Sequence, residues 1–587
     1  MPVSTIAQAA RLLSRGELSA VELTEMTLRR IDALDAQLSA FITLTAERAL
    51  EQARAADREI AAGRYRGPLH GIPIGLKDLF YTRGILTSGH SKIGIDHVPS
   101  FDATTSAKLF EAGALLMGKL ATHEFAHGGP SFDLPWPPAR NPWNTAHFTG
   151  GSSSGSAAAV AAGLVFGALG SDTGGSIRTP ASYCGVVGLK PTYGLVSRHG
   201  VIPNSFSLDH CGPLTWTVED CAIMLQAIAG YDSKDPSSIN APVPDYPALL
   251  AGGIKGMRLG VLRHLWEEDL PADDELCQAM EDAIGVLREL GAVVETARIW
   301  PAQHYYDVKV IISESEAFCI QQRDLTRRPG DYGAHYLGRV LVACLFQSAD
   351  YVRAHRQRRR LVEEMLPLYE KYDALVTAGM GPAPRLESHR SIGFWDKWQK
   401  PSITTVFDVT GGPALMLCNG FARSGMPLGM QIAGRPFDDA TVLRVANAYE
   451  QATAWRTRRP PLVAGARAPD VVLSEHGEAG PKPDPGMRQL VEALVGRAGL
   501  TLPEPVLQQL CEAAPYALAM VSRLPMHSWP DEPANVFRFP EAWHAWAARR
   551  DRGRRQRGKS VRTASRRGDA IRKAQSPRAP RRQGGGT

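Results

Sequence analysis

The stretch GGSSSGSAAAV, Gly150 to Val160, sets four serines among glycines. A P-loop would use such glycines to bind phosphate, but it also needs a Gly-Lys-Ser/Thr sequence, and no lysine follows here. The pentapeptide GSSSG fits the nucleophile elbow G-x-S-x-G, with Ser153 as nucleophile. That elbow follows a buried strand, whereas the preceding ARNPWNTAHFT is polar and turn-forming. A flexible linker would not continue into SAAAVAAGLVFGALG, which is small and apolar all round, as in a buried helix.

A second glycine-rich stretch, GSDTGGSIRTP, places Gly174 and Gly175 directly before Ser176. Backbone amides at such a turn can hold an oxyanion, because glycine lets a substrate carbonyl approach closely. Upstream, GIPIGLKD puts Lys77 at the end of an apolar run, where a lysine is costly unless it is paired or neutral. A serine hydroxyl needs an adjacent base to become a nucleophile, and a neutral lysine can be that base. We therefore expect Lys77, Ser152 and Ser176 to form one site.

These blocks, together with FDVTGGPALMLCNGFARSGMPLGMQIAG (407–434), resemble the signature blocks of the amidase signature family, over roughly residues 5 to 460. Ser176 follows Ser152 by 24 positions, and several such blocks in order are highly specific. The resemblance implies a hydrolase with Ser176 as nucleophile, Ser152 as bridging serine and Lys77 as base. It also implies a cis peptide between Gly151 and Ser152, and neither a cofactor nor a metal.

Further residues match the family blocks. Those implied for the oxyanion and the acyl pocket are Thr173, Gly174, Gly175, Ala126 and His127, with the oxyanion held by the backbone amides from Thr173 to Ser176. Those implied to hold the loops and the lysine in place are Ser153, Asp172 and Arg178. Purely structural roles stay open for three of them: His127 as a surface histidine, Asp172 as a turn residue and Arg178 as a simple ion-pair partner. We interpret Cys184 as a packing residue.

The elements that must position these residues alternate between amphipathic helices and short apolar strands. The predicted strands fall at 113–120, 165–173, 257–262, 373–378 and 429–434. Since they are apolar along their length, they are typical of a mixed or parallel sheet covered by helices on both faces. We predict one large α/β catalytic domain over residues 1–463.

The chain after residue 463 has a different character. Residues 464–486 are rich in Gly, Pro and charge and predict a linker, and helical patterns follow at 487–498 and 504–524. Residues 487–546 resemble the small helical subunit of bacterial amidase complexes and of the tRNA amidotransferase. They are too short for a core of their own. We predict that this unit docks on the catalytic domain, or on that of a dimer mate, without supplying catalytic groups, and that its aromatic residues form a belt: Phe537, Phe539, Trp543 and Trp546.

Charge and composition exclude several classes of protein. The formal charge of +6 arises from the tail, because residues 549–587 carry a net +13 and the preceding residues a net −7. We predict that the basic segment 547–587 is disordered and attracts nucleic acid only nonspecifically. Neither a signal peptide nor an apolar run of about 18 residues is present, so we expect a cytoplasmic protein without a membrane partner. The eight cysteines form no C-x-x-C pair, which predicts reduced, mostly buried thiols, and we expect no metal.

Two functions follow from the resemblance. The first is a self-contained hydrolase that acts with water on a small-molecule amide or a related C–N bond. The second is the glutamine-hydrolysing A subunit of an aminoacyl-tRNA amidotransferase. The fused helical unit favours the hydrolase, because the tRNA enzyme works as separate chains. Aromatic residues between about 300 and 400 indicate an apolar or aryl substrate without deciding it. The sequence leaves open whether the protein forms a homodimer.

Overall fold

The computed structural model of the chain describes residues 3–386, 400–471, 484–526 and 586. The chain divides into two compact units, residues 1–531 and 532–587. Of the second unit only Gly586 belongs to the described residues. The fold and the site described below therefore lie in the first unit.

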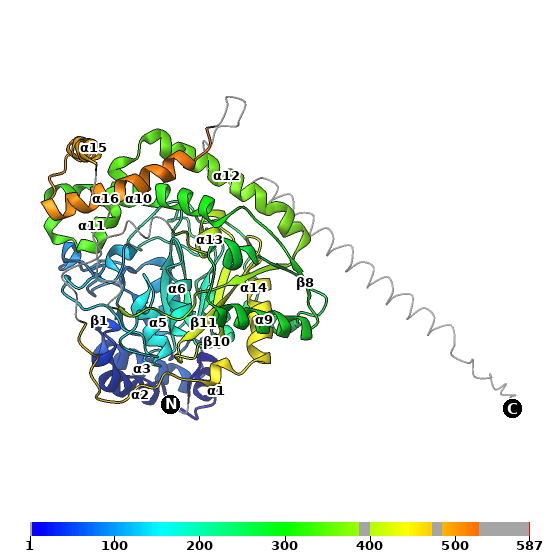
Figure 1. Cartoon of the computed structure of the whole chain (residues 1–587). Coiled ribbons are helices and arrows are strands. Elements are labelled where there is room, and N and C mark those ends of the chain that lie inside the picture. Colours follow the sequence, from blue (N-terminus) through cyan, green and yellow to red (C-terminus); the bar gives the residue numbers. More distant parts are fainter. Residues whose placement is uncertain (1–2, 387–399, 472–483, 527–585, 587) are drawn as a thin grey trace. The chain divides into compact units, whose positions relative to one another are not determined.

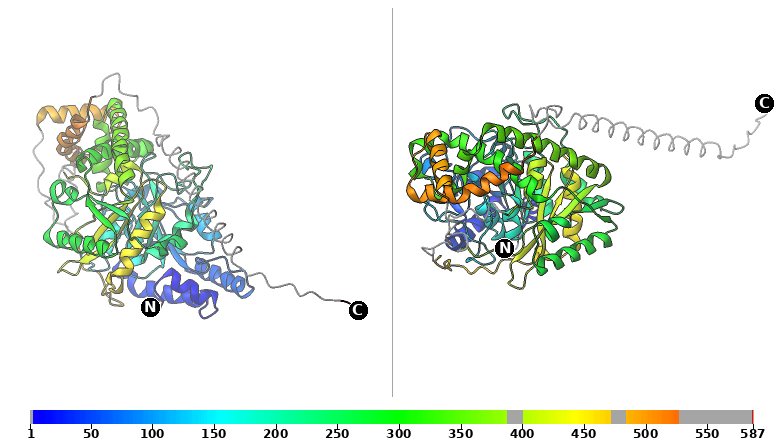
Figure 2. Two further views of the ribbon diagram at one scale, coloured as in Figure 1. Left: turned by 90° about the vertical axis from the view of Figure 1, so that its right-hand side faces the viewer. Right: turned by 45° about the horizontal axis from the view of Figure 1, so that its top comes forward.

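An 11-stranded mixed sheet forms the centre of the first unit, in the order β1-β3-β2-β4-β6-β5-β10-β11-β9-β7-β8. Helices surround the sheet in every view (Figures 1 and 2). The predicted α/β class with a large mixed sheet is confirmed, and each predicted strand segment overlaps a strand. The strands are β1 (Phe41–Leu44), β2 (Pro73–Lys77), β3 (Leu115–Leu120), β4 (Gly167–Asp172), β5 (Val187–Lys190), β6 (His210–Thr215), β7 (Arg258–Val261), β8 (Val293–Thr296), β9 (Ala374–Ala378), β10 (Ala414–Phe421) and β11 (Pro427–Ala433).

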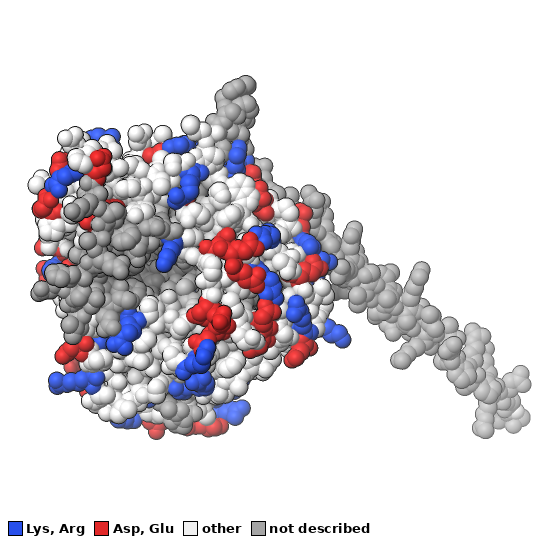
Figure 3. Space-filling model, in the orientation of Figure 1, with Lys and Arg blue, Asp and Glu red and all other residues white. Residues whose placement is uncertain are grey.

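The described α-helices precede, follow and cover these strands. They are α1 (Ile6–Ser14), α2 (Ala20–Leu34), α3 (Ala46–Ala61), α4 (Thr104–Glu111), α5 (Ser154–Ala161), α6 (Arg178–Cys184), α7 (Val218–Ile228), α8 (Tyr246–Leu249), α9 (Asp274–Glu289), α10 (Ala302–Arg327), α11 (Ala334–Val340), α12 (Ser348–Lys371), α13 (Thr405–Thr410), α14 (Asp439–Ala452), α15 (Pro485–Arg497) and α16 (Glu504–Arg523). None of the described helices is long and apolar enough to cross a membrane. On the face drawn in Figure 3, acidic and basic side chains intermingle over the described surface.

Two neighbouring strands bring the predicted site residues to one edge of the sheet. Strand β2 is parallel to β4, and every residue of both strands is buried. The carboxyl ends of parallel strands meet at the same edge, so Lys77 at the end of β2 lies beside Ser171 and Asp172 at the end of β4. This is the edge at which open α/β sheets commonly bind their ligands.

Helix α5 fixes the serine stretch at that edge. All of its residues are buried, as the small apolar sequence predicts. A Cβ added to Gly155 would lie 2.5 Å from the carbonyl oxygen of Ala40, so only glycine allows this close approach. Ser152 and Ser153 directly precede this rigid helix. Their position is therefore set by packing, as expected of a site and not of a linker.

Helices α15 and α16 agree closely with the two predicted C-terminal helices. Helix α16 packs against α10, α11 and the 3-10 turn Leu341–Leu345 of the same chain (Figures 1 and 2). Arg523 donates to both carboxylate oxygens of Asp307 on α10, at 2.6 and 2.7 Å. The buried residues of α16 are Leu510, Cys511, Ala513, Ala514, Ala517 and Met520. The predicted aromatic belt and the basic segment 547–587, apart from Gly586, lie outside the described residues.

This packing predicts that the C-terminal helices stabilise the catalytic body. Met520 is 0% exposed and Met526 is 90% exposed. Met520→Glu would bury a carboxyl group without a partner, and we expect a clear fall in the melting temperature followed by circular dichroism. The matched Met526→Glu should leave it unchanged. Truncation after Ala466 should act like Met520→Glu, and truncation after Arg549 should have no effect. Equal melting temperatures for Met520→Glu and the wild type would contradict the stabilising role.

All eight cysteines are free, and five of them are buried. Cys184 lies on α6 with its thiol 3.6 Å from the carbonyl oxygen of Thr149, and burial raises the pKa of this thiol. A thiol with a raised pKa is a poor nucleophile. The interpretation of Cys184 as a packing residue is therefore confirmed.

Candidate active site

The side-chain nitrogen of Lys77 is surrounded by serine hydroxyls. Lys77 Nζ lies 2.7 Å from Ser152 Oγ, 3.0 Å from Ser171 Oγ and 3.1 Å from Ser153 Oγ. The side chain is fully buried and makes no ion pair with any described residue. Burial lowers the pKa of Lys77 to about 7, although Asp172 and Asp209 act in the opposite direction. At neutral pH a large fraction of Lys77 is therefore an uncharged amine that can accept a proton.

Two other buried lysines show which feature sets Lys77 apart. Lys119 pairs with Asp78 at 3.2 Å, so it has a carboxylate partner. Lys190 donates to the carbonyl oxygen of Gly412 at 2.5 Å, and burial lowers its pKa to about 7 as well. A lowered pKa is therefore not unique to Lys77. The contact with several hydroxyl groups is what distinguishes it as a candidate base.

The two serine segments meet at a cavity of about 320 Å³ that Ser152 and Ser176 both line. The Gly151–Ser152 peptide is cis, as the resemblance implied. The amide of Ser153 donates to the carbonyl oxygen of Ser176 at 3.0 Å and ties the segments together. A Cβ on Gly151 would collide with the ring of His123, so the close approach requires glycine. Among the described residues, no hydrogen bond joins the Ser152 and Ser176 hydroxyls directly.

The turn before Ser176 is held by the carboxylate of Asp172. Its oxygens accept from the amides of Gly175 at 2.5 Å and Ile177 at 3.0 Å. The Gly175 amide is therefore engaged by Asp172, and the oxyanion role predicted for it stays a prediction. Thr173, Gly174 and Gly175 nevertheless all line the cavity. The Thr173 hydroxyl donates to Asp209 at 2.6 Å and fixes the other side of the turn.

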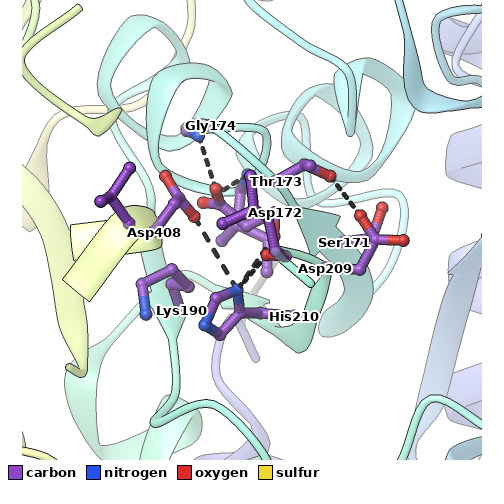
Figure 4. Close-up of polar contacts among 12 residues, drawn as sticks. Ser171, Asp172, Thr173, Gly174, Lys190, Asp209, His210 and Asp408 are labelled. Carbon is purple, nitrogen blue, oxygen red and sulfur yellow. Dashed lines mark hydrogen bonds and ion pairs between the residues drawn. The ribbon is translucent and has the colours of Figure 1, made fainter. Parts of the chain in front are cut away.

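Arg178 anchors Asp172 from behind the turn. Arg178 is fully buried, and it contacts Asp172 through Nε at 3.0 Å and Asp408 through Nη2 at 2.6 Å. Figure 4 shows the His210 ring near both Asp408 and the main chain of Asp172: its Nδ1 lies 3.8 Å from Asp408 Oδ1 and 3.2 Å from the carbonyl oxygen of Asp172. Burial alone would raise the pKa of Asp172, but the Arg178 guanidinium outweighs it and holds that pKa well below its usual range. Asp172 is therefore ionised and paired, which is more than a simple turn residue.

This arrangement predicts a large stability effect for Arg178→Met. The substitution would leave the charge of Asp172 buried without its partner, and breaking a buried pair in this way costs about 3–5 kcal/mol. We expect a lower midpoint in urea unfolding. Arg298→Met is the matched control, since Arg298 is 61% exposed in its pair with Glu268 and such surface pairs contribute about 0–1 kcal/mol. Equal midpoints for the two variants would refute the anchoring role.

A charged cluster forms another side of the cavity. Lys309 of α10 and Arg339 of α11 line it together with Ala126 and His127. Glu314 of α10 is fully buried behind them, 2.5 Å from His127 Nε2 and 3.2 Å from Arg339 Nε. Both Ala126 and His127 thus border the cavity as predicted, and His127 is a buried residue and not a surface histidine. The described residues contain no cluster of metal-ligating side chains.

Known proteins resemble this chain in both sequence and fold. The sequence profile of the family described as Amidase matches residues 22–443. The chain belongs to the Amidase family. The A subunit of glutamyl-tRNA(Gln) amidotransferase from Geobacter metallireducens is 41% identical to it over 480 residues, covering 78% of this chain and 98% of the relative. Among solved structures, native peptide amidase from Stenotrophomonas maltophilia has a TM-score of 0.66 and 33% identity, covering 78% of this chain and 98% of its own.

A further similar structure is described as an unexpected vestigial protein complex that reveals the evolutionary origins of an s-triazine catabolic enzyme. It has a TM-score of 0.70 and 33% identity, and the alignment covers 76% of this amidase-family chain and 98% of that one. The family profile ends at residue 443. The resemblance of residues 487–546 to a small helical subunit therefore stays a prediction.

Sequence reasoning missed several residues of this amidase-family site: Ser171, His123, Asn204, Lys309, Glu314 and Arg339. A signal was present for two of them, because Lys309 and Glu314 interrupt the apolar run VKVIISE, where unpaired charges are costly. The aromatic content of residues 300–400 left an apolar or aryl substrate undecided, and the described residues that line the cavity are mostly polar and include two cations. The aromatic residues of SIGFWDKW lie outside the described residues.

Proposed function

We propose that this chain hydrolyses a carboxamide or a related C–N bond through an acyl-enzyme on Ser176. The observation that carries the proposal is Lys77 Nζ, fully buried and 2.7 Å from Ser152 Oγ, at a cavity that Ser176 also lines. A lysine held among hydroxyls with a pKa near neutrality can act as a general base.

In the proposed reaction, Ser176 Oγ attacks the amide carbonyl carbon, and its proton passes through the Ser152 hydroxyl to Lys77. Backbone amides of Thr173, Gly174 and Ser176 stabilise the oxyanion, each such donor being worth about 10²–10³ in rate. The C–N bond then breaks, the relay returns the proton to the leaving nitrogen, and ammonia or an amine departs. Water attacks the acyl-serine through the same relay, which releases the acid and restores Ser176.

The state of Lys77 predicts the pH dependence of this reaction. Only the uncharged amine accepts a proton, so kcat/KM should rise with pH through an apparent pKa near 7, well below that of a free lysine. Because the relay couples several groups, the measured value belongs to the relay as a whole. Stopped assays of ammonia release between pH 5 and 10 test this. A kcat/KM that falls as pH rises through 7 would contradict a lysine base.

The glutamine-hydrolysing subunit of a tRNA amidotransferase is the second candidate, because a protein of that name is 41% identical to this chain. We favour the self-contained hydrolase for two reasons. The C-terminal helices α15 and α16 occupy a surface of the catalytic body in the same chain. The presence of these helices in one chain with the catalytic body also favours a self-contained hydrolase, because the tRNA enzyme works as separate chains.

A substrate panel separates the two candidates. The hydrolase should release ammonia from simple amides, anilides, ureas or carbamates when the chain is assayed alone. An amidotransferase component should instead release ammonia from glutamine only with a partner protein and tRNA. Ammonia release that depends on both additions would reverse our preference.

A further inference from the structure

The active-site cavity presents positive charge to whatever it binds. Lys309 and Arg339 line the same cavity as Ser152 and Ser176. Among the described lining residues there is neither an aspartate nor a glutamate. The two cations come from α10 and α11, and α16 packs against both helices on the outside.

One carboxylate lies behind these cations. Glu314 is 3.2 Å from Arg339 Nε and 3.8 Å from Lys309 Nζ. Burial alone would raise the pKa of Glu314, but His127, Arg339 and Lys309 outweigh it and lower the pKa to about 2. Burial lowers the pKa of His127, while Glu314 acts in the opposite direction. Among the described residues of this cluster, two cationic side chains thus lie beside a single carboxylate.

The ammonium group of Lys309 lacks acceptors within the described part of the protein. Its side chain is 6% exposed, and the contact with Glu314 at 3.8 Å is too long for a hydrogen bond. Burial and the neighbouring Arg339 lower its pKa to about 8, so it is mostly protonated at neutral pH. An ammonium carries three donors, and leaving them unmatched in a buried place is costly. An anion in the cavity would supply the acceptors.

Lys309 also lies close to the reacting centre. A Cβ added to Gly174 would come within 2.7 Å of Lys309 Cε and 3.5 Å of its Nζ. The Lys309 side chain therefore packs against the turn that leads into Ser176. An anion held by Lys309 must be only a few atoms away from the carbonyl that Ser176 attacks.

We propose that the substrate is a small amide whose acyl part carries a carboxylate, bound by Lys309 and Arg339 a short distance from the scissile carbonyl. The proposal rests on the amidase function proposed above and names the substrate class of that site. The guanidinium fork of Arg339 suits a carboxylate, and Lys309 adds a point charge beside it. Both residues are substrate-binding and take no part in proton transfer.

Matched substrates test this selectivity. Succinamate should be hydrolysed with a kcat/KM at least about tenfold above that of its neutral isostere isocaproamide, because a hydrogen-bonded charge pair is gained. Lys309→Met should remove this preference by lowering kcat/KM for succinamate at least about tenfold more than kcat/KM for isocaproamide. Arg298→Met removes an equal charge from the surface and should change neither value. Equal kcat/KM for the two amides in the wild type, or equal losses on both amides in Lys309→Met, would overturn the proposal.

A binding measurement keeps the proposal testable apart from catalysis. Succinate and glutarate should bind the full-length protein in calorimetry and slow the labelling of Ser176 by a neutral fluorophosphonate, and Lys309→Met and Arg339→Met should each weaken binding at least about tenfold. Melting curves show that the variants are folded. If Ser176 is labelled but neither dicarboxylate binds, the anion site is wrong and the amidase proposal stands. If the dicarboxylates bind through Lys309 but Ser176 is not labelled, the reverse holds.

Discussion

Ser176→Ala is expected to lower kcat by about 10⁴- to 10⁶-fold while the protein stays folded, because the substitution removes the oxygen that would form the acyl-enzyme. The half-buried Ser176 contributes its backbone to the structure through the hydrogen bond from the Ser153 amide, and alanine retains that carbonyl. We therefore expect the melting temperature to change little. Ammonia release by the purified variant, measured on the best amide of the panel, gives the rate.

Ser154→Ala is the matched control for this loss. Ser154 is buried, its hydroxyl donates to the carbonyl oxygen of Ala121 at 3.3 Å, and it does not line the cavity. Its substitution should leave kcat within about tenfold of the wild type, since it removes no group from the proposed relay. Residual activity of Ser176→Ala close to that of Ser154→Ala would exclude Ser176 as the nucleophile.

Lys77→Met is expected to lower kcat/KM by several orders of magnitude and at the same time to stabilise the fold. Burial lowers the pKa of Lys77 from 10.5 to about 7, so the unfolded chain binds a proton that the folded chain does not. The stability of the wild type therefore decreases as pH falls from about 10.5 to about 7, by on the order of 4–5 kcal/mol. Methionine carries no charge that must be lost on folding, so the variant should not be destabilised in this way. The unfolding free energy of Lys77→Met should therefore exceed that of the wild type by an amount that grows as pH falls over that range.

Lys119→Met is the contrasting control, because Lys119 has the carboxylate partner that Lys77 lacks. Removing it leaves Asp78 buried without its ion pair, which costs about 3–5 kcal/mol. Urea unfolding at pH 7 should give opposite signs for the two variants: a higher midpoint for Lys77→Met and a lower one for Lys119→Met. Near-full activity of Lys77→Met would end the proposal of a lysine base, and a lower midpoint would mean that Lys77 is not held neutral.

The catalytic side of the site was predictable because its residues belong to local blocks. Ser152 and Ser153 precede a small apolar helix, Ser176 follows two glycines, and Lys77 ends an apolar strand, so each block carries its own signal in the sequence. The strands were predictable for the same reason, since short apolar runs between turns indicate buried strands in a mixed sheet. Ser171 was missed because nothing in the strand sequence GALGSD marks its serine as a site residue. Its role depends on contact with Lys77, which lies on the neighbouring parallel strand β2.

The binding side was not predictable from such signals. Lys309 and Arg339 belong to different helices, and only the tertiary packing of α10 and α11 places them in one cavity with Glu314 behind them. The hydrogen bond from the Gly175 amide to Asp172 was not predictable either. The residue types alone do not determine which backbone amides of a turn are bound by a side chain and which remain free. The aromatic content of residues 300–400 suggested an apolar pocket, whereas composition says nothing about which side chains face a cavity.

The most direct test of the proposed mechanism is to treat the full-length wild-type protein with a fluorophosphonate and locate the adduct by peptide mass spectrometry. Ser176 should carry the label, because it lines the cavity beside the Lys77 and Ser152 relay. Ser176→Ala should remain unlabelled, and Lys77→Met should be labelled far more slowly at pH 7. An adduct on Ser153 would instead support a nucleophile elbow, and that result, or a folded wild-type protein without any adduct, would contradict the assignment of Ser176.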